Sequence, residues 1–572
     1  MVRFPSGATL AQLVEHHAEN VGVRSSILRG RTTFFARFPP RSAFATLDFQ
    51  AGVAQLVEHV TRNDGVTGSI PVTSSIQGPA DPYPRPHVMT TNRNAAHPHS
   101  GDAAGTREPK GPASDPLQGL MVSPSGVRGI VGQSLTPDVV LRVAGAHASF
   151  LDPGPVVVGR DTRPSGVWVS RLTQAALLAS GHDVVDVGIA PTPTILFAIR
   201  HHGASGGIAI TASHNPAPWN ALKLFGPGGT FLAPAQSEEV ARRARAGGVT
   251  WAAHTQVGSI REDPDAIGRH REAILALAGF DRPRIRARGF RVVVDATNGA
   301  GWEATPALLE ALGCEVERLF CEPTGRFPRV AEPLPENLGA LGERVRATGA
   351  ALGFANDPDA DRLAIVDERG EPIGEERTLQ IAVDWALSLH PGPVAVNAST
   401  SIGVDQIARR YGATVHRTKI GEAHVAQKLI EIGGVIGGEG NGGVIYPALH
   451  ATRDGLLAAA IVVDWLARDA RSLSARLAEL PPVIMVKRKL DLRLEDTEAL
   501  SEALRREFPD GERNVLDGEK YVWEDSWVQV RASGTEPIVR ILAEARSRED
   551  AEALASRAGQ AIERSQTHAR AR

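Results

Sequence analysis

The chain has 572 residues, of which 42% are hydrophobic and 22% charged, a balance that excludes a wholly disordered protein. Its 62 basic and 65 acidic residues give a net charge of −3, which argues against a general nucleic-acid binder. No apolar run has the length of a membrane-spanning helix. Two cysteines, Cys314 and Cys321, are too few for a disulfide scaffold or a cysteine-based zinc site.

Residues 1–120 differ from the rest of the chain. They show little periodicity, and residues 78–116 are rich in Pro, Ser, Thr, Asn, His and Gly, which favours disorder. The hexapeptide Ala-Gln-Leu-Val-Glu-His occurs at 11–16 and again at 54–59. Its codons can be written as the D-arm of a transfer-RNA gene, and those of Gly-Ser-Ile-Pro at 68–71 as the T-arm. We therefore interpret residues 1–75 as translated tRNA genes, with a pair of short amphipathic helices as the alternative, and expect the start at Met89 or Met121.

From Met121 onward, strand-like and helix-like segments alternate. Short valine-rich runs typical of buried strands are followed by segments of helical composition. The expected strands are residues 155–159, 182–187, 207–210, 291–295, 314–320, 363–366 and 393–397, and the expected helices are residues 170–180, 304–312 and 407–411. This alternation predicts α/β domains with parallel or mixed sheets.

The last portion of the chain predicts a smaller α+β domain. It combines expected strands at 483–492, 527–531 and 539–544 with expected helices at 500–508 and 547–565. We therefore divide the chain into an N-terminal extension, residues 1–120, and four expected domains, residues 121–262, 263–370, 371–480 and 481–572.

A polar loop, Thr-Ala-Ser-His-Asn-Pro at 211–216, directly follows the expected strand 207–210. A serine at the exit of a strand is exposed and well oriented, and Asn215 is placed to help hold a charged group beside Ser213. An ordinary polar turn is the alternative, because Asn-Pro favours turns.

An acidic loop places Asp357, Asp359 and Asp361 at alternate positions before the expected strand 363–366. An extended backbone would point all three carboxylates to one side. Their repulsion would be strong without a cation between them, and oxygen ligands favour Mg²⁺ or a similar hard ion. A solvated acidic turn is the alternative reading.

A glycine-rich loop at 437–443 surrounds one carboxylate, Glu439, and one amide, Asn441, with five glycines. Glycine allows a ligand to approach the backbone closely, so both side chains are candidates for binding sugar hydroxyls. No Gly-Lys-Ser/Thr follows, so the loop is not a P-loop. A flexible loop without function is the alternative.

The fourth loop, Arg-Ala-Ser-Gly-Thr-Glu-Pro at 531–537, is followed by Arg540. Arginine binds phosphate bidentately, and hydroxyls with free backbone N–H groups complete an anion site. The chemistry favours phosphate binding over a plain turn between two strands.

The four loops occur in the order found in a known family. Supporting motifs are Ser-Gly-Val-Arg-Gly at 125–129, Gly-Arg-Asp-Thr-Arg at 159–163 and Thr-Lys-Ile-Gly at 418–421. The set resembles the α-D-phosphohexomutase superfamily from about Val122 to the C-terminus. The resemblance implies three similar mixed-sheet α/β domains and a smaller C-terminal α+β domain around a central cleft, each giving one loop to the site.

The resemblance also implies a mechanism. Ser213 would be a phosphoserine that gives its phosphate to a sugar phosphate and receives one back from the bisphosphorylated sugar. One Mg²⁺ would be bound by the acidic loop and the Ser213 phosphate. The residues implied are, as catalytic groups, Ser213, Lys223, Arg128 and Arg362; as metal ligands, Ser213, Asp357, Asp359 and Asp361; as sugar-binding groups, Glu439 and Asn441; and as phosphate-binding groups, Arg531, Ser533, Gly534, Thr535 and Arg540.

The sugar loop departs from the family pattern. Many bacterial members carry Gly-Glu-x-Ser-Gly-His, whereas Asn441 and Gly443 stand here at the Ser and His positions. Where that histidine assists proton transfer, Lys223 or the substrate phosphate would have to replace it. The loop is similar to that of archaeal-type phosphoglucosamine mutases, which implies interconversion of glucosamine 6-phosphate and glucosamine 1-phosphate. A phosphomannomutase/phosphoglucomutase is the alternative.

Two other classes of protein stay open at this point. A phosphatase with Asp357 or Asp359 as nucleophile would not need Ser213, and a sugar-phosphate sensor would leave Ser213 unphosphorylated. Single histidines, including His214 and His450, are interpreted as structural. The expected partners are a hexose phosphate as substrate and a bisphosphorylated hexose as activator, with no nucleic acid and no membrane, for a cytoplasmic monomer or homodimer.

Overall fold

A computed structural model describes residues 24–28, 31–35, 115–491, 497–532 and 538–570. The chain divides into two compact units, residues 1–106 and 107–572. In the first unit, β1 (Arg24–Leu28) and β2 (Arg31–Phe35) pair as an antiparallel hairpin, which the sequence did not predict. Both copies of the repeated hexapeptide lie outside the described residues.

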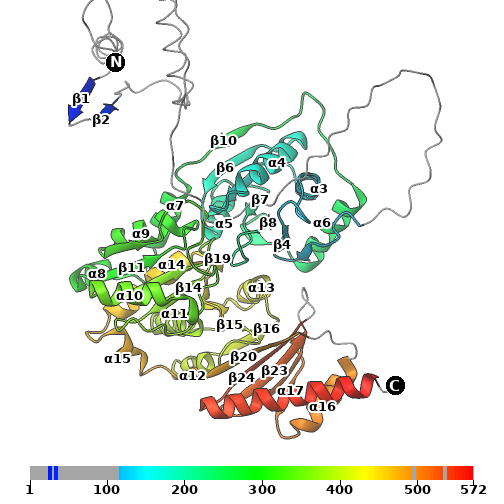
Figure 1. The fold of residues 1–572 in the computed structure, drawn as a ribbon, viewed down its shortest axis with the longest axis vertical. Helices are drawn as coiled ribbons and strands as arrows, with labels where there is room; N and C mark the ends of the chain where they lie inside the picture. Colours follow the sequence, from blue (N-terminus) through cyan, green and yellow to red (C-terminus); the bar gives the residue numbers. More distant parts are fainter. Residues whose placement is uncertain (1–23, 29–30, 36–114, 492–496, 533–537, 571–572) are drawn as a thin grey trace, which may run out of the picture. The chain divides into compact units, whose positions relative to one another are not determined.

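The first sheet of the second unit has the strand order β10-β6-β5-β7-β8-β4-β3, with β9 beside β8 (Figure 1). Strands β10, β6, β5 and β7 are parallel, whereas β8 is antiparallel to both β7 and β4. The strands are β3 (Met121–Ser123), β4 (Gly126–Ile130), β5 (Val156–Arg160), β6 (Val184–Ile189), β7 (Gly206–Ile210), β8 (Trp219–Gly226), β9 (Thr230–Phe231) and β10 (Ile260–Glu262), and the helices are α3 (Pro137–Ala148), α4 (Gly166–Ala179), α5 (Thr192–His201) and α6 (Pro234–Ala246).

Two further mixed sheets follow, with the strand orders β12-β11-β13-β14 and β16-β15-β17-β18-β19. The second sheet contains β11 (Arg291–Asp295), β12 (Glu315–Leu319), β13 (Leu352–Asn356) and β14 (Leu363–Val366), with α7 (Ala266–Leu275), α8 (Arg282–Arg288), α9 (Gly301–Leu312), the short 3₁₀ helix η1 (Pro335–Asn337) and α10 (Gly339–Thr348). The third contains β15 (Val394–Asn397), β16 (Val415–Thr418), β17 (Ile436–Glu439), β18 (Gly443–Tyr446) and β19 (His450–Arg453), with α11 (Glu375–Leu389), α12 (Gly403–Arg410), α13 (Glu422–Ile432), α14 (Gly455–Ala467) and α15 (Leu473–Leu477).

The same four-strand arrangement occurs in all three sheets. Strand orders β6-β5-β7-β8, β12-β11-β13-β14 and β16-β15-β17-β18 each join three parallel strands to an antiparallel fourth. The loop between the last two strands of each set is, in turn, the serine, acidic and glycine-rich loop. The fold therefore presents one candidate site loop from the same place in each domain, and the expected fold class is confirmed.

The second and third sheets share one hydrophobic core, which the sequence did not predict. Helix α14 contacts α9 of the second domain and α11 of the third, and all 13 of its residues are buried. A helix that is apolar all round is found in the interior of a protein. Trp385 of α11 lies in the same core, with its indole N–H bonded to Asp464 of α14 at 2.7 Å.

The fourth sheet is antiparallel, with the order β20-β24-β23-β22-β21. Helices α16 and α17 pack together, and α17 covers the sheet (Figure 1). Its elements are β20 (Met485–Leu490), α16 (Thr497–Glu507), β21 (Glu512–Asn514), β22 (Glu519–Val522), β23 (Trp527–Ala532), β24 (Val539–Glu544) and α17 (Arg548–Arg570). This is the small α+β domain expected from the sequence, and it has its own core.

Candidate active site

The serine loop is held by a bond within the loop and by a bond to the acidic loop. Ser213 is buried, and its φ of 50° lies in the left-handed region that non-glycine residues rarely adopt. Its Oγ donates to Asp357 Oδ2 at 2.8 Å, although the two residues belong to different domains. Its backbone N–H donates to Thr211 Oγ1 at 3.0 Å. Such strain clusters at functional sites, where the surroundings over-determine the backbone.

A buried arginine, Arg163, stabilises the serine loop by binding its backbone carbonyls. Its guanidinium donates to the carbonyls of Ser213 and Asn215, each at 2.7 Å, and of Pro216 at 2.8 Å. Asp161 accepts from Arg163 Nε at 3.0 Å and balances the charge. Both residues belong to the Gly-Arg-Asp-Thr-Arg motif at 159–163, but no pattern in the sequence predicted this role for Arg163.

The acidic loop brings its carboxylates together through a turn. One oxygen each from Asp357, Asp359 and Asp361 lies within 4.8 Å of the others, and all three residues are buried. The expectation of an extended backbone is wrong, because Ala360 N–H donates to Asp357 O at 3.0 Å and Ala360 has a φ of 53°. Convergence thus comes from a tight turn that ends in one residue with a left-handed backbone.

The residues present fit a hard divalent cation. Asp359 Oδ1 and Asp361 Oδ1 are buried and accept no hydrogen bond, and carboxylate oxygens are the ligands that Mg²⁺ prefers. Burial raises the pKa of Asp357 well above its usual range, and the charges of Asp361 and Asp359 raise it further. A bound cation would offset both effects.

Lys223 and Arg453 pair with the Oδ2 atoms of Asp359 and Asp361. Lys223, on β8, lies 2.5 Å from Asp359 Oδ2 and 3.4 Å from Asp361 Oδ2. Burial lowers its pKa, but the two carboxylates outweigh burial and raise the pKa above its ordinary value. Arg453 lies 2.7 Å from Asp361 Oδ2. The Oδ1 atoms of Asp359 and Asp361, which accept no hydrogen bond, therefore stay available to bind a metal ion.

Arg128 and Arg362 also lie beside the serine and acidic loops. Arg128 Nη1 donates to Asn215 Oδ1 at 3.1 Å, and Arg362 Nε is 3.8 Å from Asp361 Oδ1. Burial lowers the pKa of His214 well below its usual value, and Arg362 and Arg128 lower it further. The neutral form of His214 is therefore the stable one beside these guanidinium groups.

Glu439 of the sugar loop is buried and already holds four donors. Its Oε1 accepts from Asn397 Nδ2 and Gly421 N, both at 3.0 Å. Its Oε2 accepts from Arg453 at 2.8 Å and from Asn441 Nδ2 at 3.4 Å. Glu439 is thus rigidly placed, and the half-buried Asn441 is the more accessible of the two.

Arg453 also accounts for the glycine at position 443. A Cβ at Gly443 would lie 2.3 Å from Arg453 Cδ. A histidine there, as in many bacterial sugar loops, would displace the arginine. Arg453 therefore fills the space that a side chain at 443 would need, and it connects the metal loop to Glu439. Sequence reasoning missed Arg453, although its place before the helix cap Asp454 marks the end of a strand.

The phosphate loop is described only at its two ends. Arg531 and Arg540 lie directly opposite each other on the antiparallel strands β23 and β24. Directly opposed like charges are destabilising, and an anion between the two guanidinium groups would offset this repulsion. Among the described residues, the partly buried Arg531 lies 3.8 Å from the carboxylate of Asp517. Ser533, Gly534 and Thr535 lie outside the described residues.

Four family profiles match the chain in succession. They are the phosphoglucomutase/phosphomannomutase alpha/beta/alpha domains I, II and III, at residues 120–248, 270–370 and 375–484, and the C-terminal domain of the same family, at 485–559. The chain belongs to the phosphoglucomutase/phosphomannomutase family. It is a phosphohexomutase, an isomerase that transfers phosphoryl groups, as the sequence predicted. The bounds that the sequence analysis set for the domains stay predictions.

Similar proteins cover nearly the same region. A probable phosphoglucosamine mutase from Methanopyrus kandleri is 39% identical, across 75% of this chain and 95% of that protein. A phosphoglucomutase/phosphomannomutase from Thermococcus kodakarensis is 40% identical, across 76% and 96%. The crystal structure of a phosphoglucomutase/phosphomannomutase family protein from Burkholderia thailandensis has a TM-score of 0.70 at 29% identity, across 79% and 98%.

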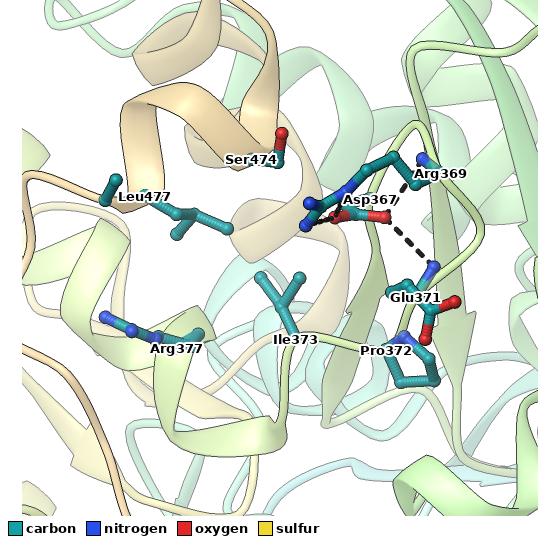
Figure 2. A pocket seen from close by; sticks show the side chains of 9 residues that line it. Asp367, Arg369, Glu371, Pro372, Ile373, Arg377, Ser474 and Leu477 are labelled. Atoms are coloured by element: carbon teal, nitrogen blue, oxygen red, sulfur yellow. Dashed lines mark hydrogen bonds and ion pairs between the residues drawn. The ribbon is translucent and has the colours of Figure 1, made fainter.

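A second hollow lies apart from the predicted site residues. Figure 2 shows this hollow around Ile373 and Ser474. The carboxylate of Asp367 there accepts hydrogen bonds from Arg369 and from the backbone N–H of Glu371. The hollow contains none of the predicted site residues. Among the helices of the described part of the chain, none is long and apolar enough to cross a membrane.

Glu376 lies next to the sugar loop, and it is expected to make the stability of the enzyme depend on pH. Burial raises its pKa from 4.5 to about 8, so the folded state keeps a proton that the unfolded state loses. Its contribution to stability is therefore full at low pH and declines between these two values, by up to about 1.4 kcal/mol per pH unit. Urea denaturation between about pH 5 and pH 8 is expected to show a flatter profile for Glu376→Gln than for the native enzyme.

The neighbouring Glu375 provides the control for this measurement. It is half-buried and pairs with Lys487 at 2.7 Å, and because burial is the main cause of the Glu376 shift, Glu375→Gln should change the slope much less than Glu376→Gln does. A constant free-energy difference between Glu376→Gln and the native enzyme at every pH would contradict the assignment.

Proposed function

We propose that this phosphohexomutase interconverts glucosamine 6-phosphate and glucosamine 1-phosphate through a phosphoserine at Ser213. The observation that carries the mechanism is the 2.8 Å bond from Ser213 Oγ to the acidic loop of another domain. A nucleophilic hydroxyl beside converging carboxylates and a buried lysine is the arrangement that phosphoryl transfer needs, since that reaction depends mainly on positioning and charge neutralisation.

In the first half-reaction, the phosphoryl group leaves Ser213 Oγ for a free hydroxyl of the sugar phosphate. The P–Oγ bond breaks, a new P–O bond forms on the sugar, and the proton of the sugar hydroxyl is passed on to the departing Ser213 Oγ. The resulting bisphosphorylated sugar turns over and returns its other phosphate to Ser213. The same bisphosphate, supplied from outside, would phosphorylate an empty Ser213 and so act as activator.

Three groups would neutralise charge during the transfer. Asp357, Asp359 and Asp361 would hold one Mg²⁺, which when bound offsets the charge on the transferred group. Lys223 keeps its proton because two carboxylates face it, so it acts as an electrostatic group or proton donor. Arg128 and Arg362 would contact the phosphate on Ser213.

The fourth domain would hold the phosphate that does not react. Arg531 and Arg540 face each other at the base of the loop, and Ser533, Gly534 and Thr535 would complete the anion site. One fixed anchor lets either end of the sugar reach Ser213. Asn441, more accessible than Glu439, would then contact the sugar's hydroxyl or amino group. The cytoplasmic location and the choice between monomer and homodimer stay predictions.

The substrate preference supplies the test. The Ser213-phosphorylated enzyme with Mg²⁺ is expected to show at least a tenfold higher kcat/KM for glucosamine 6-phosphate than for glucose or mannose 6-phosphate, about 1.4 kcal/mol of discrimination. Asn441→Ser is expected to reduce this preference, whereas Ser399→Ala, which removes a bond to Gln529, should not.

A phosphomannomutase/phosphoglucomutase is the second candidate. It is favoured by the similar protein from Thermococcus kodakarensis that carries this name. A higher kcat/KM for the mannose or glucose phosphate would establish it and overturn the amino-sugar assignment, while leaving the phosphoserine mechanism intact.

A further inference from the structure

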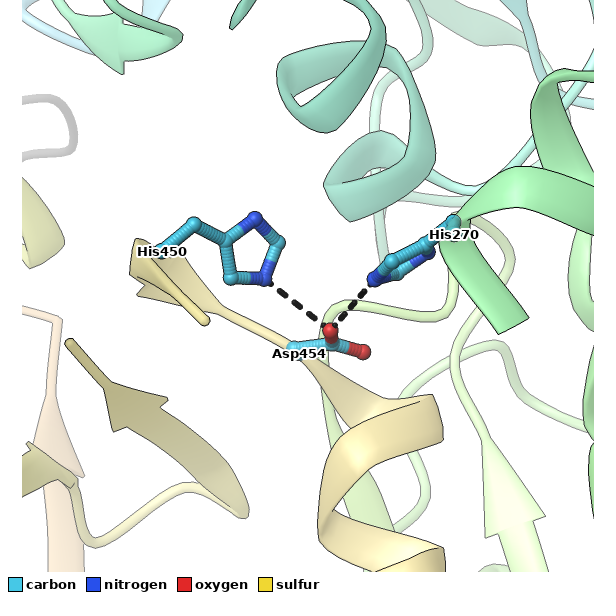
Figure 3. A group of neighbouring side chains, drawn as sticks. All are labelled: His270, His450 and Asp454. Atoms are coloured by element: carbon cyan, nitrogen blue, oxygen red, sulfur yellow. Dashed lines mark hydrogen bonds and ion pairs between the residues drawn. The ribbon is translucent and has the colours of Figure 1, made fainter. Parts of the chain in front are cut away.

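A buried cluster outside the reacting groups joins three domains. Figure 3 shows His270 and His450 on either side of Asp454, which begins α14. Asp454 Oδ2 lies 2.9 Å from His270 Nε2 and 3.0 Å from His450 Nε2. His270, on α7, also lies with Nδ1 2.9 Å from Thr194 Oγ1 of α5. All four side chains are fully buried or nearly so.

The hydrogen bonds fix the orientation of His270. The carboxylate of Asp454 can only accept, so Nε2 of His270 donates to it, and Nδ1 makes the second bond, to the Thr194 hydroxyl. Phe197 stacks on the imidazole, with ring centroids 5.3 Å apart. His270 is therefore held in one orientation between the first and third domains.

This link is part of a closed ring that contains the metal loop. Thr192, two residues before Thr194, donates to Asp359 O at 2.9 Å and to Asp359 Oδ2 at 2.6 Å. Gly455, directly after Asp454, donates to Ala360 O at 3.1 Å. The ring thus runs from α5 through the metal loop to α14 and returns through His270.

The metal loop needs such restraint. Ala360 adopts a left-handed φ of 53°, and three carboxylates converge beside it. Both features oppose the observed conformation, so the surrounding structure must impose it. A Cβ on Gly455 would lie 2.7 Å from Ala360 O, which shows how closely the loop rests on the start of α14.

The side chains of His270, His450 and Asp454 do not suit a second metal site. The Oδ1 of Asp454 accepts from Leu456 N at 2.9 Å and Leu457 N at 3.0 Å. With the two histidines on Oδ2, the carboxylate already accepts four hydrogen bonds, which use all of its lone pairs. The cluster is therefore a hydrogen-bonded connector.

We propose that His270 is a positioning residue of the mutase, which closes this ring and so sets the geometry of Asp359 and Asp361 for the divalent cation. The proposal rests on the proposed function of the acidic loop. His270 touches none of the reacting groups. It acts through Thr194 and Thr192 on one side and through Asp454 and Gly455 on the other.

Mn²⁺ binding to the full chain tests the proposal without measuring turnover. Electron paramagnetic resonance titration is expected to show an affinity about tenfold weaker for His270→Phe, the usual effect of losing a partner behind the metal ligands. Phenylalanine keeps the ring stacking and removes both hydrogen bonds. His270→Gln offers one donor and one acceptor and should recover most of the affinity. Thr194→Val breaks the ring at another bond and should weaken Mn²⁺ binding in the same direction.

His182→Phe is the matched control. His182 is also buried and bonds two carbonyls, Gly154 O at 2.9 Å and Ala148 O at 3.0 Å, but only within the first domain. It should lower the melting temperature and leave Mn²⁺ affinity unchanged. Native affinity in both His270→Phe and Thr194→Val would overturn the proposal, as would one zinc ion per native chain that is lost in His270→Phe. If the native enzyme itself bound no Mn²⁺, the proposed metal binding by the acidic loop would be contradicted as well.

Discussion

Ser213→Ala is expected to reduce mutase activity by about 10³-fold or more, because the phosphoryl group then has no acceptor on the enzyme and both half-reactions stop. The variant should also take up no label from a bisphosphorylated hexose labelled in its phosphates. Both effects are measured on the full chain, by a coupled assay for the product and by phosphate incorporation.

The variant should remain folded. Ser213 Oγ lies 2.8 Å from Asp357 Oδ2 and 3.3 Å from His214 Nδ1, and the loss of the first bond leaves a carboxylate that a cation can still satisfy. Ser205→Ala, which removes a bond to Pro155 O in the same domain, is the control for activity. A phosphatase with an aspartate nucleophile would keep its hydrolytic activity in Ser213→Ala, so survival of turnover would replace the mutase mechanism by that alternative.

The positions of the serine and acidic loops could be predicted from the sequence because a short apolar strand lies directly beside each of them. Residues 207–210 and 363–366 were predicted as strands beside Ser213 and the acidic triplet, and both are strands. The repeated strand order then places these loops equivalently. Periodicity and motif order carry this information, since both are properties of neighbouring residues.

The contacts that support the site could not be predicted in this way. Thr192 binds Asp359, 167 residues away, and no local pattern distinguishes it from any threonine before a helix. Arg163 and Arg453 pair with groups that lie on other segments of the chain, and the core shared through α14 depends on how two domains pack. Such contacts follow from tertiary structure and leave no periodic signal. The middle of the phosphate loop, 533–537, lies outside the described residues, so its three predicted ligands stay predictions.

The second large effect is expected at Lys223. Its ammonium group is buried 2.5 Å from Asp359 and 3.4 Å from Asp361. Lys223→Met leaves Asp359 without its charged partner and Asp361 with its arginine partners alone, and breaking a buried ion pair from one side costs about 3–5 kcal/mol of unfolding free energy. Denaturation in urea with a chelator present measures this loss, and kcat should fall with it because the lysine is proposed to neutralise the transferred group.

Mg²⁺ separates the two roles of Lys223. If the acidic loop binds the cation, added Mg²⁺ should recover part of the lost stability of Lys223→Met, because a divalent charge again neutralises Asp359 and Asp361. It should not recover kcat, since the ammonium group is still missing. Lys223→Met with the same stability in chelator and in Mg²⁺ would contradict the metal assignment.

Lys520 is the matched control, because it is the opposite kind of buried lysine. It donates to Ala398 O at 2.6 Å and lies 3.8 Å over the Trp527 ring, and burial lowers its pKa well below the usual value. Its charged form is thus unfavourable in the folded state, whereas that of Lys223 is favoured. Lys520→Met should therefore cost little stability or increase it, and it should not respond to Mg²⁺. A large loss in Lys223→Met and none in Lys520→Met would show that the carboxylates of the acidic loop, and not burial alone, determine what a lysine contributes here.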